Sequence, residues 1–241
     1  MSVNVSENLE VIKEKIAAAE LKAGRKPGSV KLMAVSKFHA VEEILPALEA
    51  GQILFGENRV QEANEKFPGI FQKYPKAQLH MIGQLQTNKV KTAVQIASCI
   101  QSVDRLDLLK EIEKQAAKIN KNIEVLFELH TGEESKSGYA SLEILKESLD
   151  ACADGNFPHI IPKGFMTMAP FTDDKALVRK SFTTLREVKN QLSKEYPQFD
   201  FTELSMGLPG DFEIAIEEGA TLVRVGTAIF GERDYSKKKL I

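Results

Sequence analysis

The sequence predicts an α/β protein built as a (β/α)₈ TIM barrel with an extra helix at its amino-terminal end. Short apolar runs rich in β-forming residues alternate with helical patterns along almost the whole chain. Most of these runs lack the period-two alternation of half-exposed strands, which favours strands covered on both faces in a parallel sheet. Eight such runs in 241 residues match the usual barrel size of about 250 residues.

The predicted strands and helices follow one another in regular order. Helical patterns are clearest over 105–119 and 176–194, where apolar residues recur at helical spacing. Asp104 is the expected N-cap of the first of these helices. An opening helix over about 7–22 ends before a Gly-Arg-Lys-Pro-Gly break, and a helix over 211–218 ends at a glycine. The strands are expected at residues 31–36, 53–56, 78–83, 99–103, 123–130, 160–167, 201–205 and 222–225.

A doubly wound open sheet is the main alternative to the barrel. No G-x-G-x-x-G motif follows an early strand, which removes one reason to prefer that fold. The chain also shows no internal repeat, low-complexity stretch or linker. We therefore predict a single domain over residues 1–241.

Composition excludes several classes of function. The 32 basic and 34 acidic residues give a formal net charge of −2, so bulk electrostatics do not indicate nucleic-acid or membrane binding. No apolar stretch approaches the roughly 18 residues of a membrane span, and we expect a soluble, cytoplasmic protein. Cys99 and Cys152 have no metal-ligand spacing, so we interpret both as reduced packing residues and predict no metal site.

Lys37 ends the apolar run of the first predicted strand. A lysine that follows a buried strand must have its charge desolvated, paired or used in chemistry. Burial lowers a lysine pKa, and a neutral amine can attack an aldehyde to form a Schiff base. On position alone, however, a lysine at a strand end is more often an exposed strand terminus.

Two further segments fall on the same predicted rim, because ligands of such barrels bind at the carboxyl ends of the strands. Residues 205–207 (Ser-Met-Gly) follow strand seven, and 224–227 (Arg-Val-Gly-Thr) end strand eight before a short segment, 228–231. The glycines allow the backbone to approach an anion closely, and the hydroxyls add donors. Each piece alone has a simpler explanation, such as a turn or a structural ion pair. Together with Lys37 they predict a pocket for a phosphorylated aldehyde.

The motifs of this chain resemble one known family over nearly its whole length. It is similar to the pyridoxal phosphate homeostasis proteins, the alanine-racemase-like barrels often called the YggS or PROSC family, of the fold-type III class. The segments that carry the resemblance are residues 34–37, 55–62, 80–89, 102–105, 134–138, 164–168, 204–207 and 223–231. Any one of them is weak, but eight in the right order are specific.

The resemblance implies pyridoxal 5′-phosphate (PLP) as cofactor, held by Lys37 as an aldimine. Arg224 should then face the pyridine nitrogen and, as a permanent cation, disfavour protonation there. Lys136 is expected at the rim, where it would help cofactor entry or exit. The other implied cofactor-binding residues are Ser205, Gly207, Gly226 and Thr227 at the phosphate, Asn58 at the polar edge of the ring, and Met206 and His80 beside the cofactor.

The same resemblance bears on catalysis. Two-domain alanine racemases add a β domain that supplies a catalytic tyrosine across a dimer, whereas this sequence ends at Ile241, soon after strand eight. We therefore expect a monomer without two-base racemisation. None of the four tyrosines, Tyr74, Tyr139, Tyr196 and Tyr235, lies in a motif that recommends it as a second base.

The chain departs from the family pattern at three places. Leu79 replaces a common aromatic residue, His39 replaces a second basic residue, and 208–211 is less polar and acidic than usual. All three touch the expected pocket rim. They bear on rim contacts and cofactor exchange, but not on the aldimine.

Three functions remain open from the sequence. The first, which we favour, is a PLP-binding protein of intracellular cofactor homeostasis that buffers the aldehyde and passes it to apo-enzymes. The second is a small amino-acid racemase with a lysine base. The third is an aldolase-type Schiff-base barrel acting on a sugar phosphate, although such a lysine usually lies on a middle strand.

Overall fold

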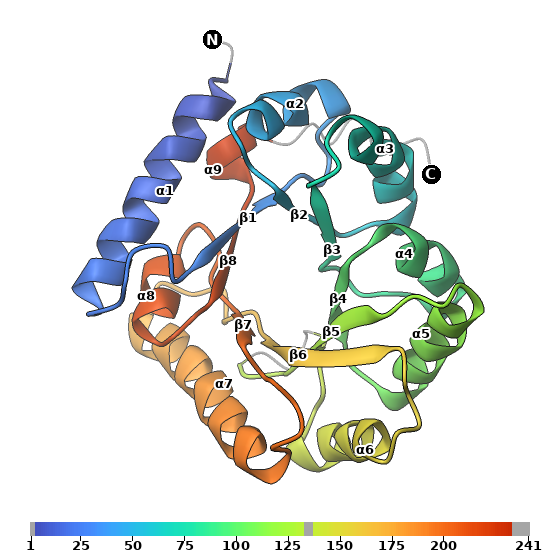
Figure 1. The fold of residues 1–241 in the computed structure, drawn as a ribbon. Coiled ribbons are helices and arrows are strands. Elements are labelled where there is room, and N and C mark those ends of the chain that lie inside the picture. Colours follow the sequence, from blue (N-terminus) through green and yellow to red (C-terminus); the bar gives the residue numbers. More distant parts are fainter. Residues whose placement is uncertain (1–2, 133–136, 233–241) are drawn as a thin grey trace.

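The computed structural model describes residues 3–132 and 137–232, and it shows eight parallel strands closed into a barrel (Figure 1). Each strand pairs in parallel with the next, and β1 pairs with both β2 and β8, which closes the ring. The predicted (β/α)₈ fold is confirmed. The strands are β1 Lys31–Val35, β2 Leu54–Glu57, β3 Gln78–Met81, β4 Cys99–Val103, β5 Ile123–Glu128, β6 Ile160–Met166, β7 Glu203–Ser205 and β8 Leu222–Val225.

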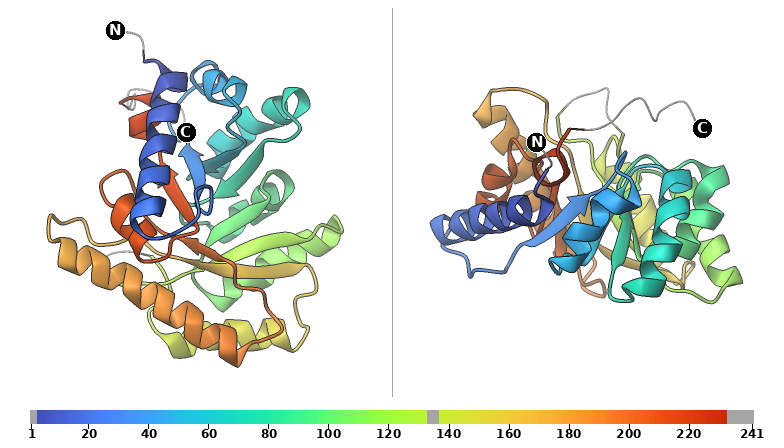
Figure 2. Two further views of the ribbon diagram at one scale, coloured as in Figure 1. Left: turned by 60° about the vertical axis from the view of Figure 1, so that its left-hand side comes forward. Right: turned by 90° about the horizontal axis from the view of Figure 1, so that it is seen from above.

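Helices surround the barrel, and the opening helix lies outside the regular β/α alternation. Helix α1 packs against α2, α8 and α9 along the outside of β1 and β8 (Figures 1 and 2). Among the described residues, no helix is both long and apolar enough to span a membrane. The helices are α1 Val5–Lys22, α2 Val41–Glu49, α3 Val60–Lys73, α4 Val90–Ile96, α5 Leu106–Lys118, α6 Leu142–Ala153, α7 Lys175–Glu195, α8 Phe212–Glu217 and α9 Thr227–Phe230, with a 3₁₀ turn at Thr87–Lys89.

Apolar side chains on both faces of the strands explain why the strand runs do not alternate. On β1, Ala34 belongs to the large core between strands and helices. Its neighbours Met33 and Val35 instead form a separate cluster with Leu54 and Leu222, from adjacent strands β2 and β8. Alternate residues of a barrel strand face the interior and the helices, so both positions are apolar here.

The predicted N-cap at Asp104 is wrong. Helix α5 begins one residue later than expected, at Leu106, and its N-cap is Arg105, which makes no side-chain cap hydrogen bond. The carboxylate of Asp104 instead accepts a hydrogen bond from the guanidinium of Arg105. A charged neighbour thus competes with the helix amides for this carboxylate.

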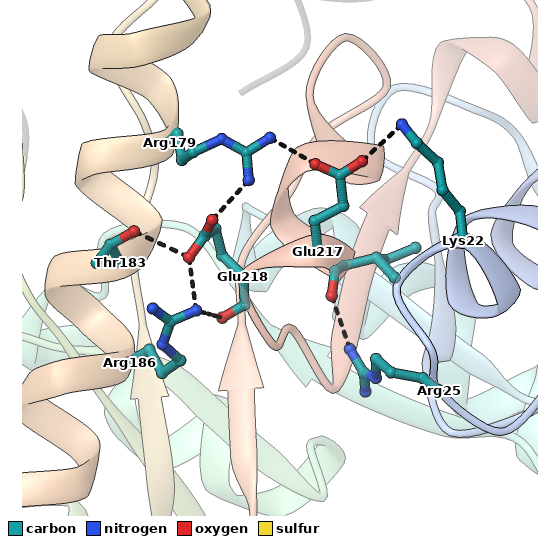
Figure 3. A network of polar contacts seen from close by, with 8 residues as sticks. Lys22, Arg25, Arg179, Thr183, Arg186, Glu217 and Glu218 are labelled. Carbon is teal, nitrogen blue, oxygen red and sulfur yellow. Dashed lines mark hydrogen bonds and ion pairs between the residues drawn. The ribbon is translucent and has the colours of Figure 1, made fainter.

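An ion-pair network fastens α1 and α7 to α8 (Figure 3). Glu217 at the end of α8 pairs with Lys22 of α1 and with Arg179 of α7. Glu218 pairs with Arg179 and with Arg186, which lie about two turns apart on α7. The network therefore fixes the connection between β7 and β8, and the predicted phosphate residues lie at or just after the ends of these two strands.

Glu218 should contribute measurably to the stability of the fold. Burial works against its charged form, but hydrogen bonds from Arg179 and Thr183 and the charge of Arg186 outweigh that cost and hold the pKa of this carboxyl below its ordinary value. Glu218→Gln should lower the free energy of unfolding by about 2 kcal/mol, measured by urea unfolding at pH 7. Because the folded-state pKa is depressed, this contribution should disappear as the pH falls through it.

Glu217→Gln is the matched control, because the side chain of Glu217 is 21% exposed against 10% for Glu218, and its partner Lys22 is 73% exposed. Exposed ion pairs contribute only about 0–1 kcal/mol. Equal losses for the two variants, or a Glu218 effect that persists under acidic conditions, would contradict this assignment.

Candidate functional site

A cavity of about 370 Å³ opens at the carboxyl ends of the barrel strands, within the roughly 300–1,000 Å³ typical of small-molecule sites. A larger hollow of about 460 Å³ lies at the opposite end, beside α1 and the starts of β1 to β3, but ligands of such barrels bind at the carboxyl end. Apolar side chains, including Met166 and Met168, line part of the carboxyl-end cavity. Five of the nine predicted site residues line it as well: Lys37, Asn58, Arg224, Gly226 and Thr227.

The loop that carries Lys37 is held from outside the barrel by a buried ammonium. The Nζ atom of Lys66, on α3, lies 3.0 Å from the carbonyl oxygen of Ser36 and 3.1 Å from that of His39. It also lies 2.6 Å from Oε1 of Glu57 and 2.8 Å from Oε1 of Glu62. Two carboxylates and two carbonyls thus surround one cation, which is only 7% exposed.

The same carboxylates also bond the loop directly. Glu62 accepts a hydrogen bond from the backbone N–H of Phe38 at 2.6 Å, and Glu57 accepts one from the hydroxyl of Ser36 at 2.7 Å. Phe38 has a φ of 67°, in the left-handed region that costs energy for a residue with a side chain. These bonds stabilise the strained backbone on both sides of Lys37. They therefore fix the position of the Lys37 Cα atom, from which the side chain extends.

Glu57 differs from the other members of this network in having a strongly raised pKa. Burial raises its pKa to about 7, although the nearby Lys66 ammonium opposes that shift. One of its carboxylate oxygens, Oε2, has no hydrogen-bond partner among the described residues. Burial therefore favours the protonated form of this group, next to the Lys37 loop, and Lys66 and Ser36 favour the charged form.

On β8, the strand that pairs with β1, Arg224 is buried and held in place by its neighbours. Its Nη1 donates to the carbonyl oxygen and the hydroxyl of Ser205, at 3.0 and 2.9 Å, and its Nη2 donates to the carbonyl oxygen of Thr167 at 2.7 Å. Burial lowers its pKa to about 10, while the charges of Glu128 and Asp211 oppose this. Arg224 is therefore a fixed cation on the cavity wall at neutral pH.

A chain of hydrogen bonds runs from Arg224 through the barrel interior to His80. The hydroxyl of Ser205 donates to Oε1 of Gln101 at 2.7 Å, and Nε2 of Gln101 donates to Nδ1 of His80 at 2.8 Å. Burial, together with the charge of Lys31, lowers the pKa of His80 to about 3. Only a neutral imidazole can accept this bond at Nδ1. His80 therefore ends a chain of hydrogen bonds that orients Gln101 and the Ser205 hydroxyl below the cavity.

The structure thus places four predicted site residues next to the cavity rather than on its wall. The Ser205 hydroxyl and His80 belong to the interior chain, and the Met206 side chain lies in the main core. Gly207 has a φ of 100°, and a Cβ there would meet Cα of Phe212 at 2.9 Å. Its glycine is thus required for the packing of the loop on α8, and its part in phosphate binding stays a prediction.

His80 also lies close to Cys99 and Glu124 on the two following strands. Their possible ligand atoms all lie within 4.8 Å of one another. Burial lowers the pKa of His80 to about 3 and raises that of the Cys99 thiol well above its usual range, so the thiolate that a metal ion needs is disfavoured, and the nearby charge of Lys31 opposes a second cation. We therefore assign no metal to this group.

Sequence reasoning missed the supporting residues Lys66 and Gln101. Gln101 left a signal, since it is a polar residue in the middle of a buried apolar strand. The only sequence signal for Lys66 was its position four residues after Glu62 on a helix, a spacing that usually indicates a solvated ion pair. Lys136 lies outside the described residues. Among the departures from the family pattern, residues 208–209 do line the cavity.

Comparison with known proteins places this barrel in a family. Residues 7–234 match the family described as alanine racemase, N-terminal domain. A protein of Vibrio cholerae named pyridoxal phosphate homeostasis protein is 39% identical, over 97% of this chain and 98% of its own. The protein of the same name from Aquifex aeolicus is 40% identical, over 97% of this chain and 100% of its own.

Solved structures agree with the sequence matches. PipY of Synechococcus elongatus without PLP has a TM-score of 0.84 at 32% identity and covers 94% of this chain and 100% of its own. The structure of PipY with PLP bound has a TM-score of 0.79 at 33% identity and covers 90% and 100%. The chain therefore belongs to the alanine racemase N-terminal domain family and, within it, to the pyridoxal phosphate homeostasis proteins.

Removal of the Lys66 ammonium should loosen the Lys37 loop. In Lys66→Met the buried Glu57 loses the ammonium that favours its charged form, so it must either take up a proton or stay charged without a partner, and the free energy of unfolding should fall by up to about 3–5 kcal/mol. Backbone amides of residues 36–39 should also exchange faster with deuterated water. Both effects can be measured, by chemical unfolding and by hydrogen-exchange mass spectrometry.

The double variant Glu57→Gln/Lys66→Met is the control, since it removes both charges together. It should be more stable than Lys66→Met alone, because the fully buried Glu57 is no longer an ionisable group without a partner, while Glu62, whose side chain is 17% exposed, keeps contact with water. A single variant as stable as the natural protein, with unchanged exchange at 36–39, would show that this cation does not hold the loop.

Proposed function

We propose that this protein binds PLP at the carboxyl end of the barrel, as an aldimine on Lys37, and serves intracellular PLP homeostasis. The observation that carries the proposal is one cavity that brings together a lysine amine, a buried arginine and the Gly226–Thr227 turn. PipY, a solved protein of the same fold at 33% identity, holds PLP. The relatives that match along the whole chain are named for PLP homeostasis.

The residues present fit the chemistry of this cofactor. Lys37 supplies the amine for the aldehyde, and Gly226 and Thr227 supply the backbone and hydroxyl for the phosphate, at the start of α9. Arg224 is fixed by Ser205 and Thr167, and only three of its five N–H groups are used by these bonds among the described residues. The remaining donors suit the pyridine nitrogen, which the positive charge keeps unprotonated.

Asn58 lines the same cavity from the end of β2, where its amide suits the polar edge of the ring. Ser205 and Gly207 support the wall beside the proposed phosphate position, since Arg224 bonds both of them through its side chain and its backbone N–H. We assign His80 and Met206 a supporting role below the ring. PLP, when bound, supplies a reactive aldehyde and an electron sink.

A holding role suits the cavity better than racemisation. Among the described residues, Lys37 and Arg224 supply the only titratable side chains of its wall. The hydroxyls of Tyr139 and Tyr196 are engaged elsewhere, by Ser148 and Asp150. A racemase needs a second acid–base group on the opposite face of the cofactor, and the described residues of this wall offer no tyrosine, histidine or carboxyl for that role. Apo-enzymes as recipients, the cytoplasmic location, the monomeric state and the single domain stay predictions.

Absorbance spectra of the natural protein and of Lys37→Ala, each mixed with PLP, test the proposal. The natural protein should show an absorbance band at about 420 nm, as protonated PLP aldimines do, and the variant should not. Lys163→Ala, which removes a half-buried lysine of β6 that is not on the cavity wall, is the matched control and should keep the band.

Addition of L-amino acids separates holding from catalysis. Unchanged chirality after incubation with the loaded protein supports the homeostasis role, whereas D-isomers above the Lys37→Ala background would make the protein a racemase. No band in any variant after addition of PLP would overturn the assignment of the cofactor.

A further inference from the structure

A second hollow lies beside the cavity, and we call it the side pocket. It encloses about 340 Å³ and is lined by residues 58–61, 84–86 and Lys89. Its walls come from the start of α3 and from the segment that links β3 to α4. Asn58 and Gln84 line both hollows, so an occupant of the side pocket would lie directly next to the proposed cofactor.

The polar side chains of the side pocket are all hydrogen-bond donors. Arg59 and Lys89 are cations, and the other four polar side chains are primary amides. No carboxylate stands among the described residues that line it. Arginine forks, ammonium groups and amide N–H groups together are the donor set that proteins use for carboxylates and phosphates.

The two cations lack the partners that such groups usually have. Both side chains are half-buried, yet in the part of the chain that the structure describes no carboxylate pairs with Arg59 or Lys89. The guanidinium of Arg59 lies over the ring of Phe38, 5.3 Å from its centroid, a contact that orients the group without neutralising it. Two unneutralised cations that face one hollow attract an anion.

All the residues that line the side pocket lie in two short segments of the sequence. They belong to segments 55–62 and 80–89, two of the motifs that carry the family resemblance. The cofactor assignment uses only Asn58 and His80 from them. Because β2 and β3 are neighbours in the barrel, the ends of both motifs meet at this pocket.

We propose that the side pocket binds a small organic anion, through a carboxylate or a phosphate group, beside the cofactor. Arg59 and Lys89 supply the charge, and the amides orient the anionic group. The role of this anion as a neighbour of PLP rests on the proposed function. Binding of the anion itself does not, because Lys37 is not among the described residues that line the side pocket.

NMR titration of the full chain, with and without PLP, tests this proposal. The probes are inorganic phosphate and propionate. Propionamide, the uncharged analogue of propionate, serves as the control ligand. Each anion, but not propionamide, should shift the backbone amides of residues 58–61 and 84–89, at a constant ionic strength of about 0.15 M. The probe that binds more tightly identifies the preferred anionic group.

The variant Arg59→Gln/Lys89→Gln should weaken anion binding at this pocket by at least about tenfold. Lys91→Gln is the matched control, because Lys91 is an exposed lysine of the adjacent helix α4 that does not line the pocket. It should bind the anions as the natural protein does.

Two results would overturn the proposal. One is shifts confined to residues 205–207 and 226–228, the proposed phosphate position of PLP. The other is affinity at 58–61 and 84–89 that the double variant leaves unchanged. Lys37→Ala keeps the two proposals apart, since it should lose the PLP absorbance band and retain the side-pocket shifts.

Discussion

Every feature of the site depends on the closure of eight parallel strands, because closure brings all their carboxyl ends to one rim. Strand β1 pairs with β2 on one side and with β8 on the other. Lys37 therefore lies between Asn58 and the Arg224 to Thr227 segment, although these residues are far apart in the sequence. Side-chain alternation along each strand then decides which of them face the cavity.

Two buried cations fix the rim on the two flanks of β1, one toward β2 and one toward β8. Lys66 ties the loop after β1 to α3 and the end of β2, and Arg224 ties β8 to β7 and to Thr167 after β6. A buried charge is costly, and its pairing often adds little net stability compared with apolar packing. Each of these cations instead bonds several backbone carbonyl or carboxylate oxygens in fixed directions. We infer that they contribute mainly to the positions of the Lys37 loop and of the Arg224 side chain at the cavity.

The sequence predicted the barrel, the rim and five residues of the cavity wall, because those depend on strand order and on motifs read along the chain. It did not predict that the hydroxyl of Ser205 turns toward Gln101, since side-chain direction depends on register between strands distant in sequence. Nor did it reveal Lys66, whose partners lie up to 30 residues away. Some of the predicted strands were also too long. The strand predicted at 123–130 ends at Glu128, and Leu129 makes only an isolated bridge to Tyr139.

The central claim is that one lysine of this chain, Lys37, holds the aldehyde of PLP. The most direct test is to treat the protein with PLP, reduce the product with borohydride and map the modified peptides by mass spectrometry. One dominant label is expected, on the peptide that contains Lys37. Free phosphate should reduce this label, because it would compete with PLP for the Gly226–Thr227 turn. A label spread over surface lysines, or concentrated on another lysine, would contradict the central claim.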